Sequence, residues 1–552
     1  MRKRVPLITL TTGTVVLETI VIWTVGAQSS LALAPQVSAP APYGVFHDIR
    51  WLLVYHESWL GFVLELIALL LFRTALTTAL VVLAWPDDRH ASPRPSWRDL
   101  ARRSAVATGI GAVALLPFAV LLFAMAVVSL SWLFFVAVPV LVMVAVLVHH
   151  GVVIPRWWYD APSRRSVGTV VLAFGALTIF GGALVACPSW LRVPLAIGAG
   201  LVNAWLWTRF VDALARHAPA PRRRPFAVVG LAAVLALVIG GTAIGFAVAV
   251  AVEGARSPVP RARANATGPP VLVVKGFNSR WEDGVTRQWV RGNYRIRRFS
   301  YRGLDDQQTP RPYERADTHR SLRALVREMR RQVDAFADAT GKPVDIVAES
   351  EGSLVARTYL AATPDAPVRS LVLLSPLLSP GRVYYPPVGD EGWGAVSGLV
   401  LDGLARAVSL LGPVDVSADT PLFRSVVDQA PALRALLGCK LPGVRELAVL
   451  PLDSGTSAPP PVEFGIPHTF RPAFHGGLLG DATTARLVGR VLHGQRPHVA
   501  SSWTTLGAVI QAGASPWQVP TLAVSVNPAW RHGRADASCR VARAELRAWV
   551  AG

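Results

Sequence analysis

With 552 residues, the chain is too long for one ordinary domain, and its composition is wrong for a wholly soluble protein. Hydrophobic residues make up 52% of it and charged residues only 16%, so we expect part of the chain to lie in a lipid bilayer. A net charge of +20 alone would suit a nucleic-acid partner, but the sequence has no zinc-finger or basic-zipper pattern. Many arginines instead cluster in short loops between apolar runs, and membrane topology explains that pattern better.

Residues 1–253 are predicted to form an all-α transmembrane bundle of about seven helices. The first apolar run follows three positive side chains at the N-terminus and is long enough to cross a bilayer core of about 30 Å. A cleaved signal peptide is the alternative for this run, because Ala32-Leu33-Ala34 resembles a cleavage site. The runs cover residues 5–26, 59–85, 105–128, 130–148, 167–186, 193–211 and 226–252.

Positive charge is distributed unevenly between the loops that join these runs. If the N-terminus is cytoplasmic, Arg and Lys concentrate in the cytoplasmic segments, whereas the outer loops hold only Arg50 and Arg192. By the positive-inside rule, this distribution favours an odd number of spans and places the chain after Glu253 outside the cytoplasm. The sequence therefore predicts a multi-pass protein of the plasma membrane with an extracytoplasmic C-terminal domain.

Three charged residues, Glu18, Glu65 and Arg73, fall inside predicted spans, where a charge is costly and often functional. One interpretation is an ion pair inside the bundle, or an Arg73 side chain that extends toward an interface. The other is a proton relay or substrate path in a membrane domain that transports or handles lipid. The sequence has no inverted repeat or paired broken helices of the kind typical of transporters.

A Pro-, Arg- and Ala-rich linker at 254–270 precedes the region 271–493, in which strand and helix patterns alternate. An amphipathic helix is predicted at 318–339. Alternation of this kind predicts an α/β domain with a mostly parallel sheet. The strands are predicted at residues 271–274, 294–301, 344–347, 369–375 and 444–452.

The turn at Ser350 is the most informative motif. A β-branched strand leads into Ala348-Glu349-Ser350-Glu351-Gly352, and a helix-forming stretch follows. A sharp turn from strand to helix strains the backbone at the serine and projects its Oγ from the sheet edge. Such a turn needs small residues two positions before and after the serine, and Ala348 and Gly352 meet that requirement.

From these residues onward the chain resembles the α/β-hydrolase superfamily, over residues 271 to about 493. The strand ending in Lys275-Gly276-Phe277 is similar to the family's strand ending in HGF, AESEGSLVAR is similar to the GHSMGGLVAR of lipases and esterases, and HGGLLGD resembles the family's histidine segment. The order serine, acid, histidine is also the family's. The resemblance implies a serine esterase or lipase that needs no metal and no cofactor and acts on a small-molecule or lipid ester.

Each site residue has a physical role under this resemblance. A serine hydroxyl needs a base to take its proton, and His475, on a Gly-rich loop before a helix, is the candidate. With His475 Nε2 expected at Ser350 Oγ, the imidazole needs a carboxylate against its other ring nitrogen, and Asp453 follows the strand at 444–452, where the family places its acid. Asp453 in a plain turn is the alternative. The substitutes for the acid are Glu463, Asp415 and Asp419, and the other histidines weighed are His468, His493, His498 and His532.

The oxyanion hole implied by the resemblance uses the backbone N–H groups of Phe277 and Glu351. Two departures from the family stand near it. Lys275 replaces the family's usual His, and Glu349 and Glu351 flank the serine, where a carboxylate aimed at the oxyanion would oppose catalysis. A non-catalytic receptor or scaffold on the hydrolase fold is therefore one alternative. Acyl transfer to an acceptor other than water is another.

The remaining segments extend this domain. Residues 376–442 are an insertion expected to form a helical lid, with helices at 396–411 and 422–437. Residues 494–552 are predicted to hold a helix at 503–511, a strand at 521–526 and a terminal helix, without an assigned role. The three cysteines lack the spacing of a zinc site. Cys439 and Cys539 form either a disulfide or two buried thiols.

Overall fold

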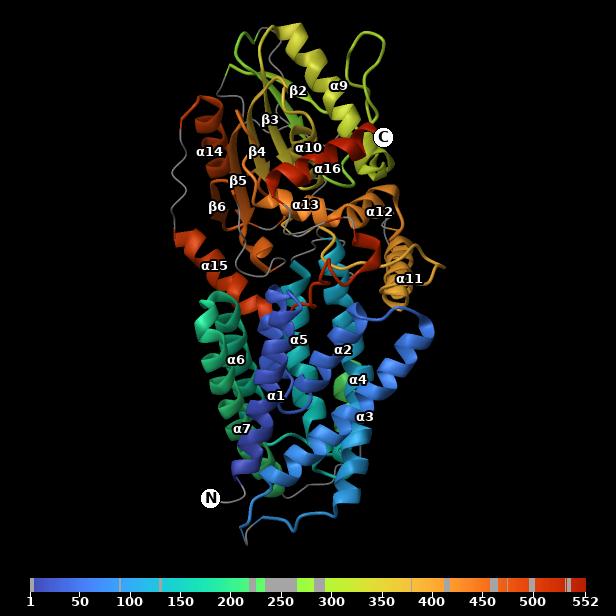
Figure 1. The fold of residues 1–552 in the computed structure, drawn as a ribbon, viewed down its shortest axis with the longest axis vertical. Helices are drawn as coiled ribbons and strands as arrows, with labels where there is room; N and C mark the ends of the chain where they lie inside the picture. The colour runs from blue at the N-terminus through green and yellow to red at the C-terminus, as the bar shows by residue number, and fades with distance from the viewer. Residues whose placement is uncertain are drawn as a thin grey trace.

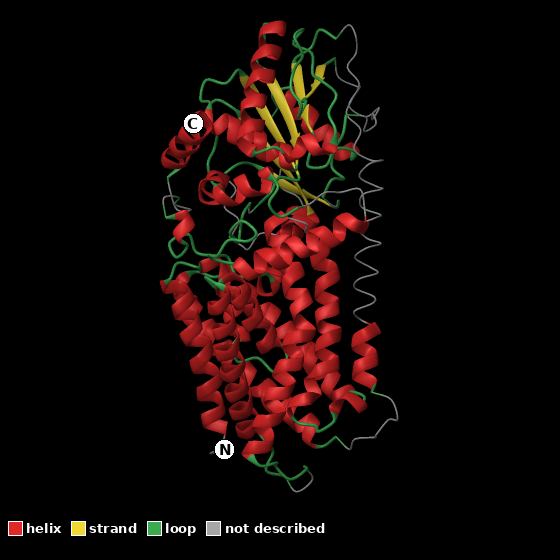
Figure 2. Cartoon of the chain, turned by 90° about the vertical axis from the view of Figure 1, so that its right-hand side faces the viewer, coloured by secondary structure: helices red, strands yellow, loops and turns green. Residues whose placement is uncertain are grey.

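The computed structural model shows an elongated molecule, with a helical bundle at one end and an α/β domain at the other (Figure 1). The strands lie at the end away from the N-terminus, as Figure 2 shows. The structure describes residues 4–88, 91–128, 132–217, 225–233, 266–281, 293–378, 380–411, 417–456, 465–473, 475–495, 502–531, 533 and 538–552.

Helices occupy the apolar runs of the first part of the chain. Four of them, α1, α3, α4 and α6, are long and apolar enough to cross a membrane. The predicted count of seven is not reached on this criterion, because α5 has only 17 residues, α7 is less apolar, and most of the run at 226–252 lies outside the described residues. The bundle helices are α1 (Arg4–Thr24), α3 (Trp59–Ala84), α4 (Trp97–Val128), α5 (Trp132–Val148), α6 (Arg164–Ala186) and α7 (Arg192–Ala215).

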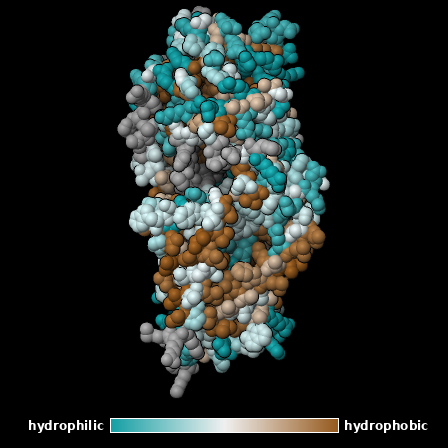
Figure 3. Space-filling view, viewed as in Figure 1, coloured by the Kyte–Doolittle hydropathy of each residue, from teal (hydrophilic) through white to brown (hydrophobic). Residues whose placement is uncertain are grey.

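The surface of the bundle is strongly apolar. Figure 3 shows hydrophobic residues gathered over the bundle and mostly hydrophilic residues over the α/β domain. Large apolar side chains such as Leu17, Leu60, Leu71 and Ile179 are exposed on α1, α3 and α6. A soluble protein rarely exposes a contiguous apolar surface of this extent, whereas a bilayer covers it without cost.

The segment between α1 and α3, expected to be an outer loop, is folded into the bundle. Both oxygens of Asp48, on α2 (Tyr43–Val54), accept hydrogen bonds from Arg73, each at 2.6 Å. His47 Nε2 lies 2.7 Å from Glu18 Oε1. Arg73 and Glu18 are thus paired inside the bundle, as the ion-pair interpretation expects, but through residues of α2, whereas Glu65 is exposed.

A six-stranded sheet with all neighbouring strands parallel forms the centre of the second domain, in the order β2-β1-β3-β4-β5-β6. The predicted parallel sheet is therefore confirmed, and the predicted strands are present. The strand predicted at 521–526 is wrong, and the last strand was not predicted. The strands are β1 (Pro270–Val274), β2 (Arg295–Arg298), β3 (Val344–Glu349), β4 (Val368–Leu374), β5 (Arg445–Pro451) and β6 (His468–Arg471).

Helices cover both faces of this sheet. On one face, α9 (Leu322–Thr340), α10 (Glu351–Ala362) and α16 (Cys539–Ala551) pack into a shared apolar core. On the other face, α14 (Ala482–Leu492) completes a second core. The central strands are buried on both faces, which is why they read as continuous Val- and Leu-rich runs.

The insertion and the first part of the C-terminal extension lie between the sheet and the bundle, whereas α16 at the end of the extension packs against α9 and α10 on one face of the sheet (Figure 1). The helix predicted at 422–437 is broken at Gln429, since the chain forms α12 (Pro421–Asp428) and α13 (Ala430–Leu437) after α11 (Ala395–Leu411). In the extension, α15 (Ser502–Ala514) precedes a short helix at Ser515–Trp517 that docks on the bundle.

One buried arginine joins the extension to the bundle. The Nη1 group of Arg50, on α2, donates to Pro516 O at 2.8 Å and to Gln518 O at 2.6 Å. Nearby, Trp517 Nε1 donates to Thr178 Oγ1 of α6 at 2.8 Å. Arg50 was expected in an outer loop, and the extension had no assigned role. In the structure, Arg50 and the extension both belong to the contact between the bundle and the α/β domain.

Candidate active site

Ser350 occupies a strained turn between β3 and α10. Its φ of 51° and ψ of −119° are unusual for a residue with a side chain. The turn requires glycine on both sides of the serine. A Cβ on Gly352 would lie 2.7 Å from Val274 Cγ1, and a Cβ on Gly276 would lie 2.8 Å from Ser350 Cβ. This is the geometry that the sequence pattern predicts for an exposed serine at a sheet edge.

The structure brings His475 to this serine. Ser350 Oγ lies 2.8 Å from His475 Nε2, within hydrogen-bond distance. The loop that carries His475 runs from β6 to α14 and is anchored by buried Leu478 and Leu479. Burial lowers the pKa of His475 to about 4. The imidazole is therefore neutral at pH 7, the form that can accept a proton from a hydroxyl.

Asp453 holds the loop that carries His475. It follows β5 in a short 3-10 helix (Leu452–Thr456) and is buried. Its Oδ2 accepts the backbone N–H of His475 at 3.1 Å, whereas the sequence led us to expect a contact with the other ring nitrogen. Burial raises the pKa of Asp453 to about 7, while backbone hydrogen bonds from His475 and Ser454 lower it. Its role as the acid of a triad stays a prediction.

The loop after β1 passes directly beside Ser350. The Phe277 ring stacks on His319 with 4.6 Å between centroids and lies 5.0 Å from Phe423 of α12. The next residue, Asn278, has a positive φ of 59°, and its N–H donates to Thr318 Oγ1 at 3.0 Å. Sequence reasoning missed this support of the loop. An Asn after Gly-Phe was its only signal, because Asn tolerates positive φ.

The glutamates that flank the serine are both buried. Burial raises the pKa of Glu351 well above its ordinary value. Burial thus favours the uncharged form of this carboxyl group, which would place no negative charge beside an oxyanion. This weakens, for Glu351, the objection raised by the sequence. Lys275, at the end of β1, is buried, and its carbonyl oxygen accepts a hydrogen bond from the Tyr301 hydroxyl.

The structure separates the other candidates from this site where it describes them. Asp419 accepts a hydrogen bond from Val388 N at 2.7 Å within the insertion. His493 contacts the Tyr294 hydroxyl at 2.9 Å, and His468 lies in β6. Within the described ranges, no group of three or more His, Cys, Asp or Glu is placed to hold a metal ion. Glu463, Asp415, His498 and His532 lie outside the described residues.

The serine edge of the sheet faces the bundle. Because all strands are parallel, their carboxyl ends share one edge. The short helix after β5 that carries Asp453 packs against α5 of the bundle and against α15. In the insertion, α11 and α12 both contact α4. The candidate site therefore lies on the side of the α/β domain that adjoins the membrane-type helices (Figure 1).

Comparisons with known proteins add little to this geometry. No protein-family model matches the chain, and no curated protein matches it. A crystal structure of Aspergillus fumigatus lipase B is similar to it at a TM-score of 0.27 and 10% sequence identity, over 68% of this chain and 95% of the lipase. A similarity at this score carries no argument about mechanism.

Proposed function

We propose that the protein is a membrane-anchored serine hydrolase of the α/β-hydrolase type that cleaves carboxylic esters. The observation that carries the proposal is the 2.8 Å contact between Ser350 Oγ and His475 Nε2 on a strained turn. In the first step, His475 takes the hydroxyl proton as Oγ attacks the ester carbonyl, and then gives it to the departing alcohol. In the second step, His475 activates a water molecule that releases the acid from Ser350.

Two further groups complete the proposed chemistry. The tetrahedral oxyanion would be stabilised by the N–H groups of Phe277 and Glu351, and burial, which raises the pKa of the Glu351 carboxyl group and so disfavours its charged form, supports this assignment. Asp453 would hold the His475 loop and stabilise the imidazolium that forms during attack. An Asp453 pKa of about 7 implies that this carboxyl group ionises near neutral pH.

The setting of the site supports a substrate that comes from the membrane. Its edge adjoins the bundle, and the insertion helix α11, which contacts α2, α3 and α4 of the bundle, exposes apolar Leu399, Val400 and Leu410. An ester with a long acyl chain fits such surroundings. We place the enzyme in the plasma membrane as a multi-pass protein, with a cytoplasmic N-terminus and the hydrolase domain outside. The disulfide between Cys439 and Cys539 favours an oxidising compartment.

A fluorophosphonate probe tests the proposal, because it reacts with activated serines. Wild type in detergent micelles is expected to take up one equivalent, and Ser350→Ala to take up none. A wild-type protein that stays unlabelled would favour the receptor or scaffold alternative. The fate of the acyl group from a labelled ester separates hydrolysis from acyl transfer, since only transfer yields a new ester with an added alcohol.

A further inference from the structure

A cavity of about 380 Å³ lies at the amino edge of the sheet, opposite the edge that carries Ser350. Its walls come from three parts of the chain: the end of α10 with the turn before β4, the turn at 441–444 before β5, and α16. The amino ends of the strands point away from the bundle (Figure 1), so we place this cavity on the side of the α/β domain that is remote from the proposed membrane.

Three guanidinium groups line this cavity. Arg540, Arg543 and Arg547 are spaced three and four residues apart, so they share one face of α16. The remaining lining is apolar or small, with Leu360, Val368 and Leu441 among it, and none of the described residues that line the cavity is acidic. The side of the cavity formed by Arg540, Arg543 and Arg547, here called the arginine wall, thus carries three positive charges. The apolar residues of the lining form its floor.

Other groups hold the acid next to this turn. The Glu446 carboxylate, below the 441–444 turn, accepts hydrogen bonds from Arg357 Nη1 at 2.6 Å and from Leu441 N at 2.8 Å, and the positive charge of Arg543 also acts on it. Glu545 lies on the part of α16 that faces Gly533. Asp365, in the turn before β4, is exposed and does not line the cavity.

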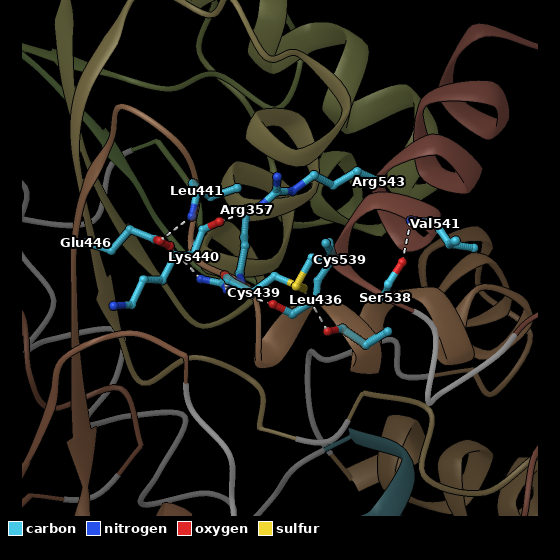
Figure 4. The surroundings of a disulfide bond; sticks show 11 residues. Arg357, Leu436, Cys439, Lys440, Leu441, Glu446, Ser538, Cys539, Val541 and Arg543 are labelled. Atoms are coloured by element: carbon cyan, nitrogen blue, oxygen red, sulfur yellow. Dashed lines mark hydrogen bonds and ion pairs between the residues drawn. A yellow bond between two sulfur atoms is a disulfide. The ribbon is translucent and has the colours of Figure 1, made fainter.

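A disulfide joins two walls of the cavity. Cys439 lies two residues before Leu441 of one wall and Cys539 immediately precedes Arg540, and their Cα atoms are 5.6 Å apart. Figure 4 shows Arg543 extending from α16 toward Lys440, whose carbonyl oxygen accepts its hydrogen bond. The arginine wall is therefore held in place before any ligand arrives, which lowers the entropy lost on binding.

We propose that this cavity binds a phosphate ester from the aqueous side. Guanidinium groups pair with phosphate oxygens in a two-pronged geometry, and three of them balance a doubly charged phosphate monoester with charge to spare. The apolar floor would take the organic part of the ester. Because the cavity lies on the opposite edge of the sheet from Ser350, this site does not depend on the proposed hydrolase activity.

Calorimetric titration of the full-length protein in detergent micelles tests this site, with glycerol 3-phosphate and dihexanoyl phosphatidic acid as probes and glycerol as the uncharged control. Wild type is expected to bind glycerol 3-phosphate, and the variant Arg540→Gln/Arg543→Gln/Arg547→Gln to bind it at least about tenfold more weakly. A matched triple variant at the exposed Arg302, Arg486 and Arg490 removes the same charge elsewhere and should bind as wild type does.

Equal affinity in wild type and the α16 variant would overturn the proposal, as would an equal loss in the matched variant or the absence of binding to wild type. If wild type binds phosphatidic acid but not glycerol 3-phosphate, the proposal that the ligand comes from the aqueous side is wrong. Thermal unfolding checks that each variant is folded. If the triple variant unfolds, the single variants Arg540→Gln and Arg547→Gln at exposed positions replace it, and each is expected to weaken binding severalfold.

Discussion

Ser350 Oγ lies 2.8 Å from His475 Nε2, although 125 positions separate the two residues in the sequence. The parallel sheet explains how they meet. Ser350 directly follows β3 and His475 follows β6, and in a parallel sheet these carboxyl ends lie on the same edge. The chain thus builds a serine–histidine contact from two loops that are each fixed by their own strand.

Gly276→Ala is expected to disable the site without unfolding the domain. The new Cβ would lie 2.8 Å from Ser350 Cβ and displace either the serine or the loop that carries Phe277. A displacement of about 1 Å can slow a reaction about 100-fold, and we expect a loss of that order in the rate of fluorophosphonate labelling. Gly403→Ala, where a Cβ meets nothing within 4 Å, is the control. Equal labelling rates in both variants would contradict the close packing.

Asp453→Asn is expected to stabilise the fold above neutral pH. Burial raises the pKa of Asp453 from 3.8 to about 7, so the folded protein holds this proton more tightly than the unfolded chain does. The carboxyl group therefore costs most stability at pH 8, and the cost shrinks as the pH falls toward 4. Thermal unfolding should show the variant more stable than wild type at pH 8, with a smaller difference at pH 5.

The control for this experiment is Asp365→Asn, at an exposed carboxylate, which should unfold as wild type does at both pH values. A difference between Asp453→Asn and wild type that does not change with pH would mean that Asp453 is ionised as easily as a surface group. Under the proposed mechanism, the same variant should also label more slowly, because an amide cannot stabilise the imidazolium.

Loss of the disulfide is expected to destabilise the α/β domain. The bond links two cysteines that are 100 positions apart in the sequence. In the chain-entropy model, a loop of this length adds about 4 to 5 kcal/mol to the free energy of unfolding. Cys439→Ser/Cys539→Ser should lower the unfolding temperature, as should a reductant added to wild type. Cys187→Ser, which removes the one free thiol among the described residues, should change nothing. An unfolding temperature unaffected by reductant would speak against the bond.

Arg73→Met is expected to destabilise the bundle. It leaves Asp48 buried without the guanidinium that donates to both its oxygens, and breaking a buried pair typically costs about 3 to 5 kcal/mol. Glu65→Gln, at an exposed position, should unfold as wild type does. If Arg73→Met unfolds at the wild-type temperature in detergent, the buried network contributes nothing to stability, and the relay interpretation gains weight.

Local sequence signals predicted much of the α/β domain. The turn at Ser350 was predictable because Ala348 and Gly352 supply the small residues that it needs, whereas the close approach of Gly276 to the serine is visible only in the structure. β6 was missed because four residues that include His468 and Arg471 show too little apolar pattern for a strand. The run at 521–526 has the composition of a strand, but its backbone hydrogen-bonds to the bundle instead of to the sheet. Thr521 O accepts a hydrogen bond from the Tyr55 hydroxyl at 3.2 Å.

The interior of the bundle was harder to predict. Arg50 was expected in an outer loop, because charged residues are usually exposed. In the structure Arg50 turns inward to the extension, and its neighbours His47 and Asp48 contact Glu18 and Arg73. No local pattern distinguishes a buried polar network from a surface loop, since the partners come from distant segments.

The central claim is that Ser350 forms a covalent acyl intermediate with an ester. Rapid mixing of wild type with p-nitrophenyl butyrate, followed by mass measurement of the digested protein, tests it most directly. We predict a burst of one p-nitrophenol per protein and a butyryl adduct on the peptide that contains Ser350, both absent from Ser350→Ala. Ester cleavage that persists in Ser350→Ala, or a wild-type protein that never carries the adduct, would contradict the claim.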